Sequence, residues 1–159
     1  MRKIIFPLLL ISAFLLSACN VSSSTELSYD STGSKVSVPG GAYTNLNVDE
    51  LQGMVENKDF LFVNVHIPFE GDIPGTDIFI PFDEIADNII NLPTPSDDIQ
   101  PDIGHLPADK DAKIVLYCRS GRMSDIAART LVDLGYTNIY HLDGGFNAWK
   151  EAGLYMEGE

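Results

Sequence analysis

The sequence has few basic residues. Its 159 residues include 10 Lys and Arg against 23 Asp and Glu, so the formal net charge is −13. Basic surfaces bind the phosphate backbone of nucleic acids, and acidic surfaces repel it. The composition therefore predicts a protein that does not bind nucleic acid.

Cysteine and histidine are also scarce, with two and three residues respectively. Two cysteines are too few for a disulfide scaffold, so stability must come from a hydrophobic core, and the length suits one compact domain. His66, His105 and His141 do not have the spacing of metal ligands. The acidic residues between 97 and 111 lack the glycine and terminal glutamate of an EF-hand loop. The sequence predicts no metal site.

No apolar segment is long enough to be a clear membrane span. The segment from Ile4 to Leu16 follows Arg2 and Lys3, and as a helix it would be roughly 20 Å long, against a hydrocarbon core of about 30 Å. This layout is typical of a secretory signal peptide. A retained transmembrane helix is the alternative.

The four residues from Leu16 to Cys19 resemble the lipobox of bacterial lipoproteins, in which the signal is cut before a cysteine that then carries lipid. The resemblance implies a signal peptide at residues 1–18, lipidation of Cys19, and a protein anchored to a membrane of the cell envelope outside the cytoplasm. An ordinary export signal with an incidental cysteine is the alternative. If Cys19 is lipidated, Cys118 has no partner within the chain, which favours a reactive thiol.

Residues 19–41 are rich in Ser, Thr and Gly and poor in large apolar residues. Such a segment buries too little surface to offset the entropy lost on ordering, so we expect a flexible tether. The folded domain is expected at residues 42–156.

Within the domain, strands and helices are expected to alternate. We expect a helix capped by Asn47, strands at 60–65, 114–117 and 138–142, helices at 124–134 and 145–152, and a short helix carrying Phe82, Ile85 and Ile89. Residues 66–81 are expected to form a structured loop, and residues 91–113 an acidic connection. This order predicts an α/β fold with a parallel sheet covered on both faces.

Cys118 stands at the carboxyl end of a predicted buried strand, and a short loop leads from it into a helix. Ligands bind at this edge of open α/β sheets. The loop N–H groups, the helix N-terminus, Arg119 and Arg122 would all stabilise an anionic sulfur. Gly121 allows the loop to curl around it. A buried structural cysteine is the alternative, but the pattern favours a reactive thiol.

The seven residues from Cys118 to Ser124 resemble the active-site loop of rhodanese-like sulfurtransferases. Residues 143–153 are similar to the closing segment of that family. Residues 64–76 are similar to a shortened, altered form of the family's stretch from Asp-Val-Arg to Gly-His-Ile-Pro-Gly. The resemblance covers about 42–155 and implies a three-layer fold with a central, mostly parallel sheet flanked by helices.

The resemblance also implies a reaction. Cys118 would take a sulfane sulfur from a small sulfur-containing anion such as thiosulfate, or from a persulfide donor, and pass it to cyanide or a thiol, including a thiol of a protein. No cofactor would be needed. The substrate-binding residues would be those of the loop: Arg119, Ser120, Gly121, Arg122 and Met123.

Three positions depart from the family pattern. Asn64, His66 and Asp72 stand where the family usually has Asp, Arg and His, and a short deletion falls between Glu70 and Gly71. We expect Asn64 and His66 to form part of the pocket wall, and the altered positions to affect donor choice more than the sulfur chemistry. His66 as a general acid or base is a further alternative.

Two other functions compete with sulfur transfer. Cysteine phosphatases of related fold have Arg at the sixth position after the cysteine, but here that position is Ser124, so the clamp for a phosphoryl group is missing. A lipid-anchored sulfur carrier or interaction module remains open. The acidic chain also repels small dianions, which predicts that free thiosulfate is a poor substrate.

Overall fold

The computed structural model describes residues 33–89 and 105–158. The predicted signal peptide, Cys19 and most of the predicted tether lie outside these residues, and so does the first part of the acidic connection. Within the described residues, no helix is long and apolar enough to cross a membrane.

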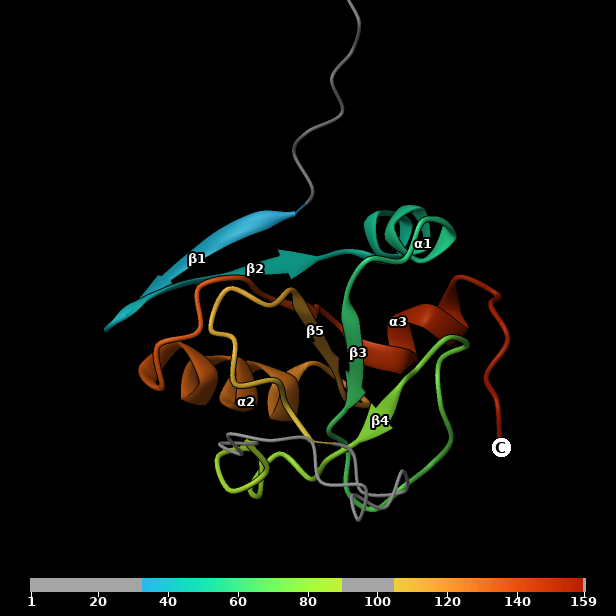
Figure 1. Ribbon diagram of the computed structural model, residues 1–159. Helices are drawn as coiled ribbons and strands as arrows, with labels where there is room; N and C mark the ends of the chain where they lie inside the picture. The colour runs from blue at the N-terminus through green and yellow to red at the C-terminus, as the bar shows by residue number, and fades with distance from the viewer. Residues whose placement is uncertain (1–32, 90–104, 159) are drawn as a thin grey trace, which may run out of the picture.

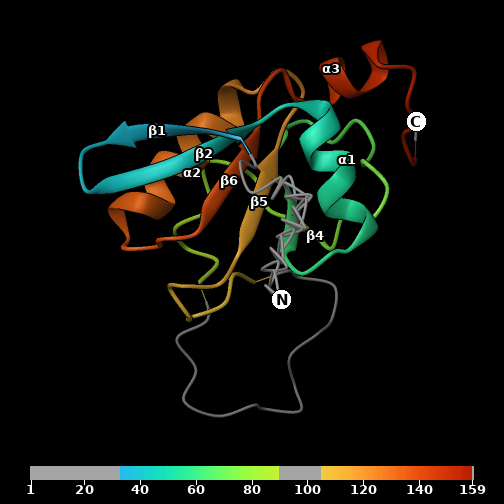
Figure 2. The same ribbon diagram turned by 90° about the horizontal axis from the view of Figure 1, so that it is seen from above.

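A six-stranded sheet forms the centre of the domain (Figure 1). Its strands are β1 (Ser34–Val38), β2 (Gly41–Leu46), β3 (Leu61–Asn64), β4 (Ile78–Phe79), β5 (Ile114–Tyr117) and β6 (Ile139–Leu142). They lie in the order β1-β2-β6-β5-β3-β4, and every neighbouring pair is parallel except β1 and β2. Figure 2 shows β1 and β2 side by side at one end of the sheet. The parallel pairing of β3 and β5 brings the loops that follow them to the same edge.

Three helices cover the sheet: α1 (Val48–Glu56), α2 (Arg122–Asp133) and α3 (Gly145–Glu151). Successive residues of a strand point to opposite faces, so β5 contributes to two separate cores. Leu116 packs in a cluster with Leu131 of α2, whereas Val115 packs in a cluster with Leu51 of α1 and Trp149 of α3. α2 therefore covers one face and α1 and α3 the other (Figure 1), which confirms the three-layer α/β fold.

The helix ends follow their local sequence signals. The Asn47 side chain accepts a hydrogen bond from the N–H of Glu50 at 2.9 Å, which confirms the predicted cap. The Glu50 carboxylate accepts one from the N–H of Asn47 at 2.8 Å and completes a capping box. Gly135 follows α2 with a φ of +89°, and the N–H of Tyr136 donates to the carbonyl of Leu131. This bond is the longer one of a Schellman motif.

The tether predicted for residues 19–41 is too long. Residues 34–38 form β1, which pairs with β2 along its whole length. Val36 and Val38 are partly buried against the core, whereas Ser37 between them is exposed. An edge strand of this kind is ordered by backbone pairing, which a polar composition does not reveal. The folded domain therefore includes residues 33–41.

The segment that carries Phe82, Ile85 and Ile89 is a series of turns and not the predicted helix. Its backbone bonds, from Glu84 to Pro81 and from Asp87 to Glu84, span three residues rather than four, so the chain turns more tightly than an α-helix. Ile85 is nevertheless buried. The preceding loop, residues 66–81, contains the two-residue strand β4.

The buried face of α2 includes polar and small residues. Ile126 and Leu134 are 38% and 40% exposed and lie outside this face. The buried positions include Ala128 and Val132 and, at the start of the helix, the polar Ser124. The helix is rotated so that Ser124 faces the end of β5, where Cys118 lies.

Candidate active site around Cys118

Cys118 directly follows β5, the strand at the centre of the parallel part of the sheet. The residue is 1% exposed, yet it forms part of the wall of a pocket of about 220 Å³. The other residues of this pocket are His66, Arg119, Ser120, Arg122 and Met123. A reactant therefore reaches the sulfur through the pocket and not from the open surface.

The loop after Cys118 presents unpaired backbone donors. The N–H groups of residues 119–124 donate no hydrogen bond to any residue that the structure describes. Gly121 has a φ of +85° and precedes α2 as its N-cap, so the chain reverses here into the helix without a side chain in the way. Gly121 does not line the pocket itself, in contrast to the other four loop residues predicted to bind substrate. Free N–H groups at a helix start form a suitable site for an anion.

The carbonyl side of the same loop is fixed by α3. The N–H of Phe146 donates to the carbonyl of Cys118 at 2.9 Å, and the N–H of Asn147 donates to that of Arg119 at 3.0 Å. Gly145 makes this approach sterically feasible, because a Cβ built on it would lie 2.1 Å from the Cys118 carbonyl oxygen. In a trans peptide unit the N–H is antiparallel to the carbonyl, so the N–H groups of Arg119 and Ser120 point away from α3.

A buried polar pair lies beneath the sulfur. Ser124 Oγ is 3.6 Å from Cys118 Sγ, 3.0 Å from the Gly121 carbonyl oxygen and 3.2 Å from His141 Nδ1. Burial lowers the pKa of His141 below its ordinary value, so its ring is neutral at neutral pH. The hydroxyl has one proton, for which the Gly121 carbonyl oxygen and the Cys118 sulfur compete as acceptors. It donates to the sulfur in the rotamer that turns away from the Gly121 carbonyl, with His141 carrying its proton on Nδ1 and donating to Ser124 Oγ.

The outer part of the pocket carries the charges. Arg119 Nη1 lies 2.9 Å from Glu70 Oε1, and His66 Nε2 lies 3.4 Å from the same oxygen. His66 Nε2 is buried and has no hydrogen-bond partner of good geometry among the described residues, while Nδ1 is 3.4 Å from the sulfur of Met123. Arg122 is exposed and forms no ion pair with a described residue. The pocket wall thus has two guanidinium groups, one of which is paired.

Asn64 does not line the pocket, contrary to the prediction. Its Nδ2 donates to the Gly71 carbonyl and to Asp72 Oδ1, and its Oδ1 accepts from the N–H of His66. Asp72 in turn accepts from the hydroxyl of Tyr117, whose pKa is raised by burial, so that the phenol stays protonated. Of the three altered positions, only His66 faces the Cys118 pocket; the other two fix the loop behind it.

Three residues of the site were not predicted from the sequence: Ser124, His141 and Glu70. In the sequence, Ser124 is notable only as the position where cysteine phosphatases have Arg. His141 lies inside a predicted strand, where a histidine is typically structural. The register of β5 and β6 places His141 opposite Leu116, on the face covered by α2, and this pairing is what brings it to Ser124. Glu70 is 49 residues from Arg119 in the sequence, and only the fold joins them.

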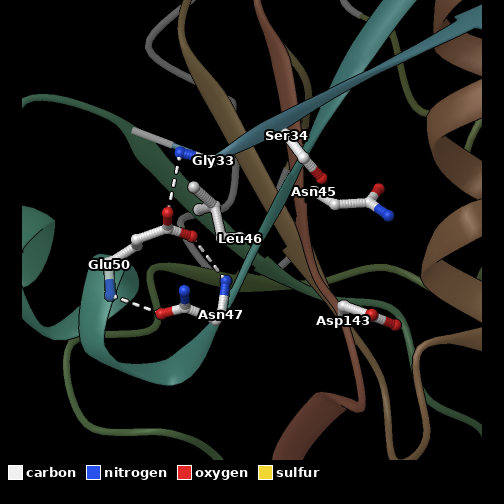
Figure 3. Close-up of a pocket in the computed structure, with 7 residues that line it drawn as sticks. All are labelled: Gly33, Ser34, Asn45, Leu46, Asn47, Glu50 and Asp143. Carbon is white, nitrogen blue, oxygen red and sulfur yellow. Dashed lines mark hydrogen bonds between the residues drawn. The ribbon is translucent and has the colours of Figure 1, made fainter. Parts of the chain in front are cut away.

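A second pocket of about 300 Å³ lies at the start of β1, beside α1 (Figure 3). Both carboxylate oxygens of Glu50 are already used here, by the N–H groups of Gly33 and Asn47. The remaining lining residues are Ser34, Asn45, Leu46 and Asp143. The lining contains neither a nucleophilic thiol nor a cationic side chain, so this pocket does not compete with Cys118 as the reactive centre.

The fold agrees with the comparison with known proteins. The model of the rhodanese-like domain matches residues 47–152, and the chain belongs to this family. Among curated proteins, it is similar to the tRNA uridine(34) hydroxylase of Erwinia tasmaniensis, with 29% identity over 107 residues. That alignment covers 66% of this chain and 27% of the relative, so the chain spans little more than a quarter of the relative's length.

Two solved structures extend this likeness. A protein of unknown function from Rhodopseudomonas palustris, described as a possible tyrosine phosphatase, is 27% identical with a TM-score of 0.54, over 71% of this chain and 83% of that one. The human single-domain sulfurtransferase is 22% identical with a TM-score of 0.57, over 67% of this chain and 95% of that one. At this identity, the second likeness shows the fold alone.

Proposed function

We propose that this domain is a sulfurtransferase that moves a sulfane sulfur from thiosulfate or a persulfide donor to a thiol or cyanide. The observation that carries the proposal is the position of Cys118. Its sulfur lines a pocket with two arginines and borders a loop whose N–H groups have no partner in the described chain. An activated thiolate in an anion-binding loop is what covalent sulfur transfer requires.

In the first step, the Cys118 thiolate attacks the outer sulfur of the donor. A bond forms between Sγ and that sulfur, and the donor's sulfur–sulfur bond breaks with its electron pair leaving on sulfite or on a thiolate. The product on the enzyme is a persulfide anion. The loop N–H groups and the Ser124 hydroxyl would stabilise the negative charge at both ends of this step.

In the second step, the acceptor attacks the terminal sulfur of the persulfide. The lone pair of cyanide or of a thiolate forms the new bond, and Cys118 leaves as a thiolate, ready for the next donor. No electrons are gained or lost overall, since each step exchanges one bond to sulfur for another. The chemistry therefore requires no cofactor.

Two activities suggested by similar proteins fit this chain less well. A phosphatase needs a cation that clamps the phosphoryl group at the sixth position after the cysteine, and that position holds the neutral, fully buried Ser124. Hydroxylation of tRNA is associated with relatives several times longer than the aligned region, and a chain with a net charge of −13 disfavours binding of RNA.

We also propose that the domain is held at a membrane of the cell envelope by lipid on Cys19. The support comes from the sequence alone, namely the apolar segment that precedes Leu16-Ser17-Ala18-Cys19. Labelling of cells with a radioactive fatty acid would test it, because Cys19→Ser should abolish incorporation into this protein. Equal labelling of both proteins would contradict the anchor.

The reaction is tested on the full chain, purified in detergent and compared with Cys118→Ser. After incubation with thiosulfate or an alkyl persulfide and removal of the donor, intact mass spectrometry should show one added sulfur on the wild type and none on the variant. Cyanide should then remove the sulfur as thiocyanate. Addition of sulfur to the Cys118→Ser protein, or to neither protein with either donor, would contradict the proposal.

The number of turnovers per Cys118 distinguishes an enzyme from a sulfur carrier. An enzyme releases many equivalents of thiocyanate per Cys118 when donor and cyanide are both in excess. A carrier accepts one sulfur and stops until a protein acceptor arrives. A single equivalent released from a fully loaded protein would favour the carrier.

A further inference from the structure

Four charged or ionisable side chains surround the entrance to Cys118. Arg119 belongs to the loop that follows the cysteine, and Arg122 is the first residue of α2. His66 and Glu70 belong to the loop that follows β3. Arg119 is 52% exposed at its side chain and Glu70 is 35% exposed, so their ion pair stands at the rim and not in the core. The His66 ring lies deeper, and it is 3% exposed.

Glu70 is held at this entrance by both neighbours. Its Oε1 is 2.9 Å from Arg119 Nη1 and 3.4 Å from His66 Nε2. Desolvation by itself would raise the pKa of Glu70, but the contacts with His66 and Arg119 outweigh it, and the pKa is lowered. Glu70 is therefore ionised at neutral pH, and the two arginines together with Glu70 contribute a net charge of +1 to the entrance.

The two donor classes make different demands on this charge. Thiosulfate brings two negative charges to the Cys118 thiolate, so the reacting system carries three. A persulfide donor brings one charge on its terminal sulfur, so the reacting system carries two. A negative side chain at the entrance repels the first system more strongly than the second, because the interaction energy scales with the product of the charges.

We propose that Glu70 selects the donor by opposing dianions, so that the preferred substrate of this site is a persulfide whose reacting end carries a single charge. This inference rests on the proposed sulfurtransferase function. It explains why an anion-binding loop with two arginines is accompanied by a carboxylate that pairs with one of them. Glu70 acts here as a specificity residue and takes no part in the transfer of sulfur.

The test compares Glu70→Gln with the wild type, using the full chain, sodium thiosulfate and a low-molecular-weight alkyl persulfide. Removing the charge should raise kcat/KM for thiosulfate about tenfold, and it should raise kcat/KM for the persulfide much less. Glu56→Gln is the matched control, since Glu56 is an exposed carboxylate at the end of α1 whose side chain makes no hydrogen bond or ion pair with a described residue. It changes the net charge equally and should leave the ratio of the two rates unchanged.

Each outcome separates this inference from the proposed function. If Glu70→Gln leaves the ratio of the two rates unchanged while Cys118 still acquires sulfur, donor selection by Glu70 is refuted and sulfur transfer stands. If Glu56→Gln changes the ratio as much as Glu70→Gln, the selection comes from net charge and not from the entrance. If neither protein acquires sulfur from either donor, the proposed function itself fails.

Discussion

The two sides of Cys118 are built differently. The inner side consists of Ser124 and His141, which are buried and neutral. Ser124 Oγ lies 3.6 Å from the sulfur, and His141 contacts Ser124. The outer side consists of His66, Glu70, Arg119 and Arg122, which surround the pocket entrance. The inner contacts join Ser124 of α2 to His141 of β6 and to Cys118 at the end of β5. The outer ion pair, between Arg119 and Glu70, joins two loops.

This difference suggests a division of roles. Groups packed in the core keep one arrangement, so the inner side is suited to positioning the thiolate and the persulfide. Exposed charged side chains interact over several ångströms and tolerate different donors, so the outer side is suited to choosing among them. If this division holds, changes on the inner side should alter the chemistry for every donor, and changes on the outer side should alter the ratio between donors.

The largest effect is expected from Gly145→Ala, which breaks the backbone support of the inner side. The new Cβ would lie 2.1 Å from the Cys118 carbonyl oxygen, at a residue with a φ of +58°. We expect the free energy of unfolding to fall by about 3–5 kcal/mol, because steric overlap adds to the cost of a left-handed conformation. Denaturant unfolding of the full chain measures it.

Gly153→Ala is the matched control for that substitution. Gly153 also has a positive φ, +79°, but no other heavy atom lies within 4 Å of the position of its Cβ. The free energy of unfolding of Gly153→Ala should therefore fall by only about 1 kcal/mol, the cost of the left-handed backbone conformation. Equal losses in the two variants would show that α3 does not press on the Cys118 loop.

Ser124→Ala should lower the rate of sulfur transfer about tenfold with thiosulfate and with a persulfide alike. The reason is that the variant removes the only side-chain hydroxyl within hydrogen-bonding distance of Cys118 Sγ among the described residues. Single-turnover loading of Cys118, followed by intact mass, gives the rate. Ser124→Thr should restore most of it, because the hydroxyl is kept.

Ser120→Ala serves as the comparison for Ser124→Ala. Ser120 lines the same pocket, but it is exposed and its hydroxyl makes no hydrogen bond with a described residue. Removal of the Ser120 hydroxyl should change the rate of sulfur transfer to Cys118 by less than about twofold. A loss at Ser124 that differs between thiosulfate and persulfide would argue against separate roles for the two sides.

The sequence was most informative where a feature depends on neighbours in the chain. The helix cap at Asn47 and the strand before Cys118 are both local, and both were predicted. The site was predicted in its continuous part, the loop from Cys118 to Met123, and at His66, which lines the pocket. Ser124, His141 and Glu70 act through contacts between distant segments, and neither spacing nor composition contains that information. Asn64 shows the reverse error, since a residue at the end of a strand beside the pocket points away from it.

The outer side is tested by a double-mutant cycle between Arg119 and Glu70. Arg119→Gln should lower kcat/KM for thiosulfate about fivefold, because the entrance loses a positive charge. Adding Glu70→Gln restores the original net charge of the entrance, so the double variant should return to within about twofold of the wild type. Steady-state kinetics at low ionic strength give the four values. A double variant as slow as Arg119→Gln alone would mean that Arg119 acts by direct contact and not through charge.

The smallest effect concerns the pH dependence of stability through His141. Burial lowers the pKa of its ring below 6.5 in the folded protein, so between that value and the folded pKa the unfolded chain binds a proton that the folded chain does not. The free energy of unfolding should therefore decrease as pH falls below about 6.5, by at most about 1.4 kcal/mol per pH unit for this one group.

His141→Gln removes the titration and should flatten the curve of unfolding free energy against pH between pH 6.5 and 5.5, while at pH 8 both proteins should show the same slope. Asp125, whose pKa is lowered chiefly by its hydrogen bond with Arg129, loses its contribution only at more acidic pH, so it does not obscure this window. Parallel curves for the two proteins from pH 8 to 5.5 would mean that the pKa of the His141 ring is the same in the folded and the unfolded chain, in which case burial does not keep the inner side neutral.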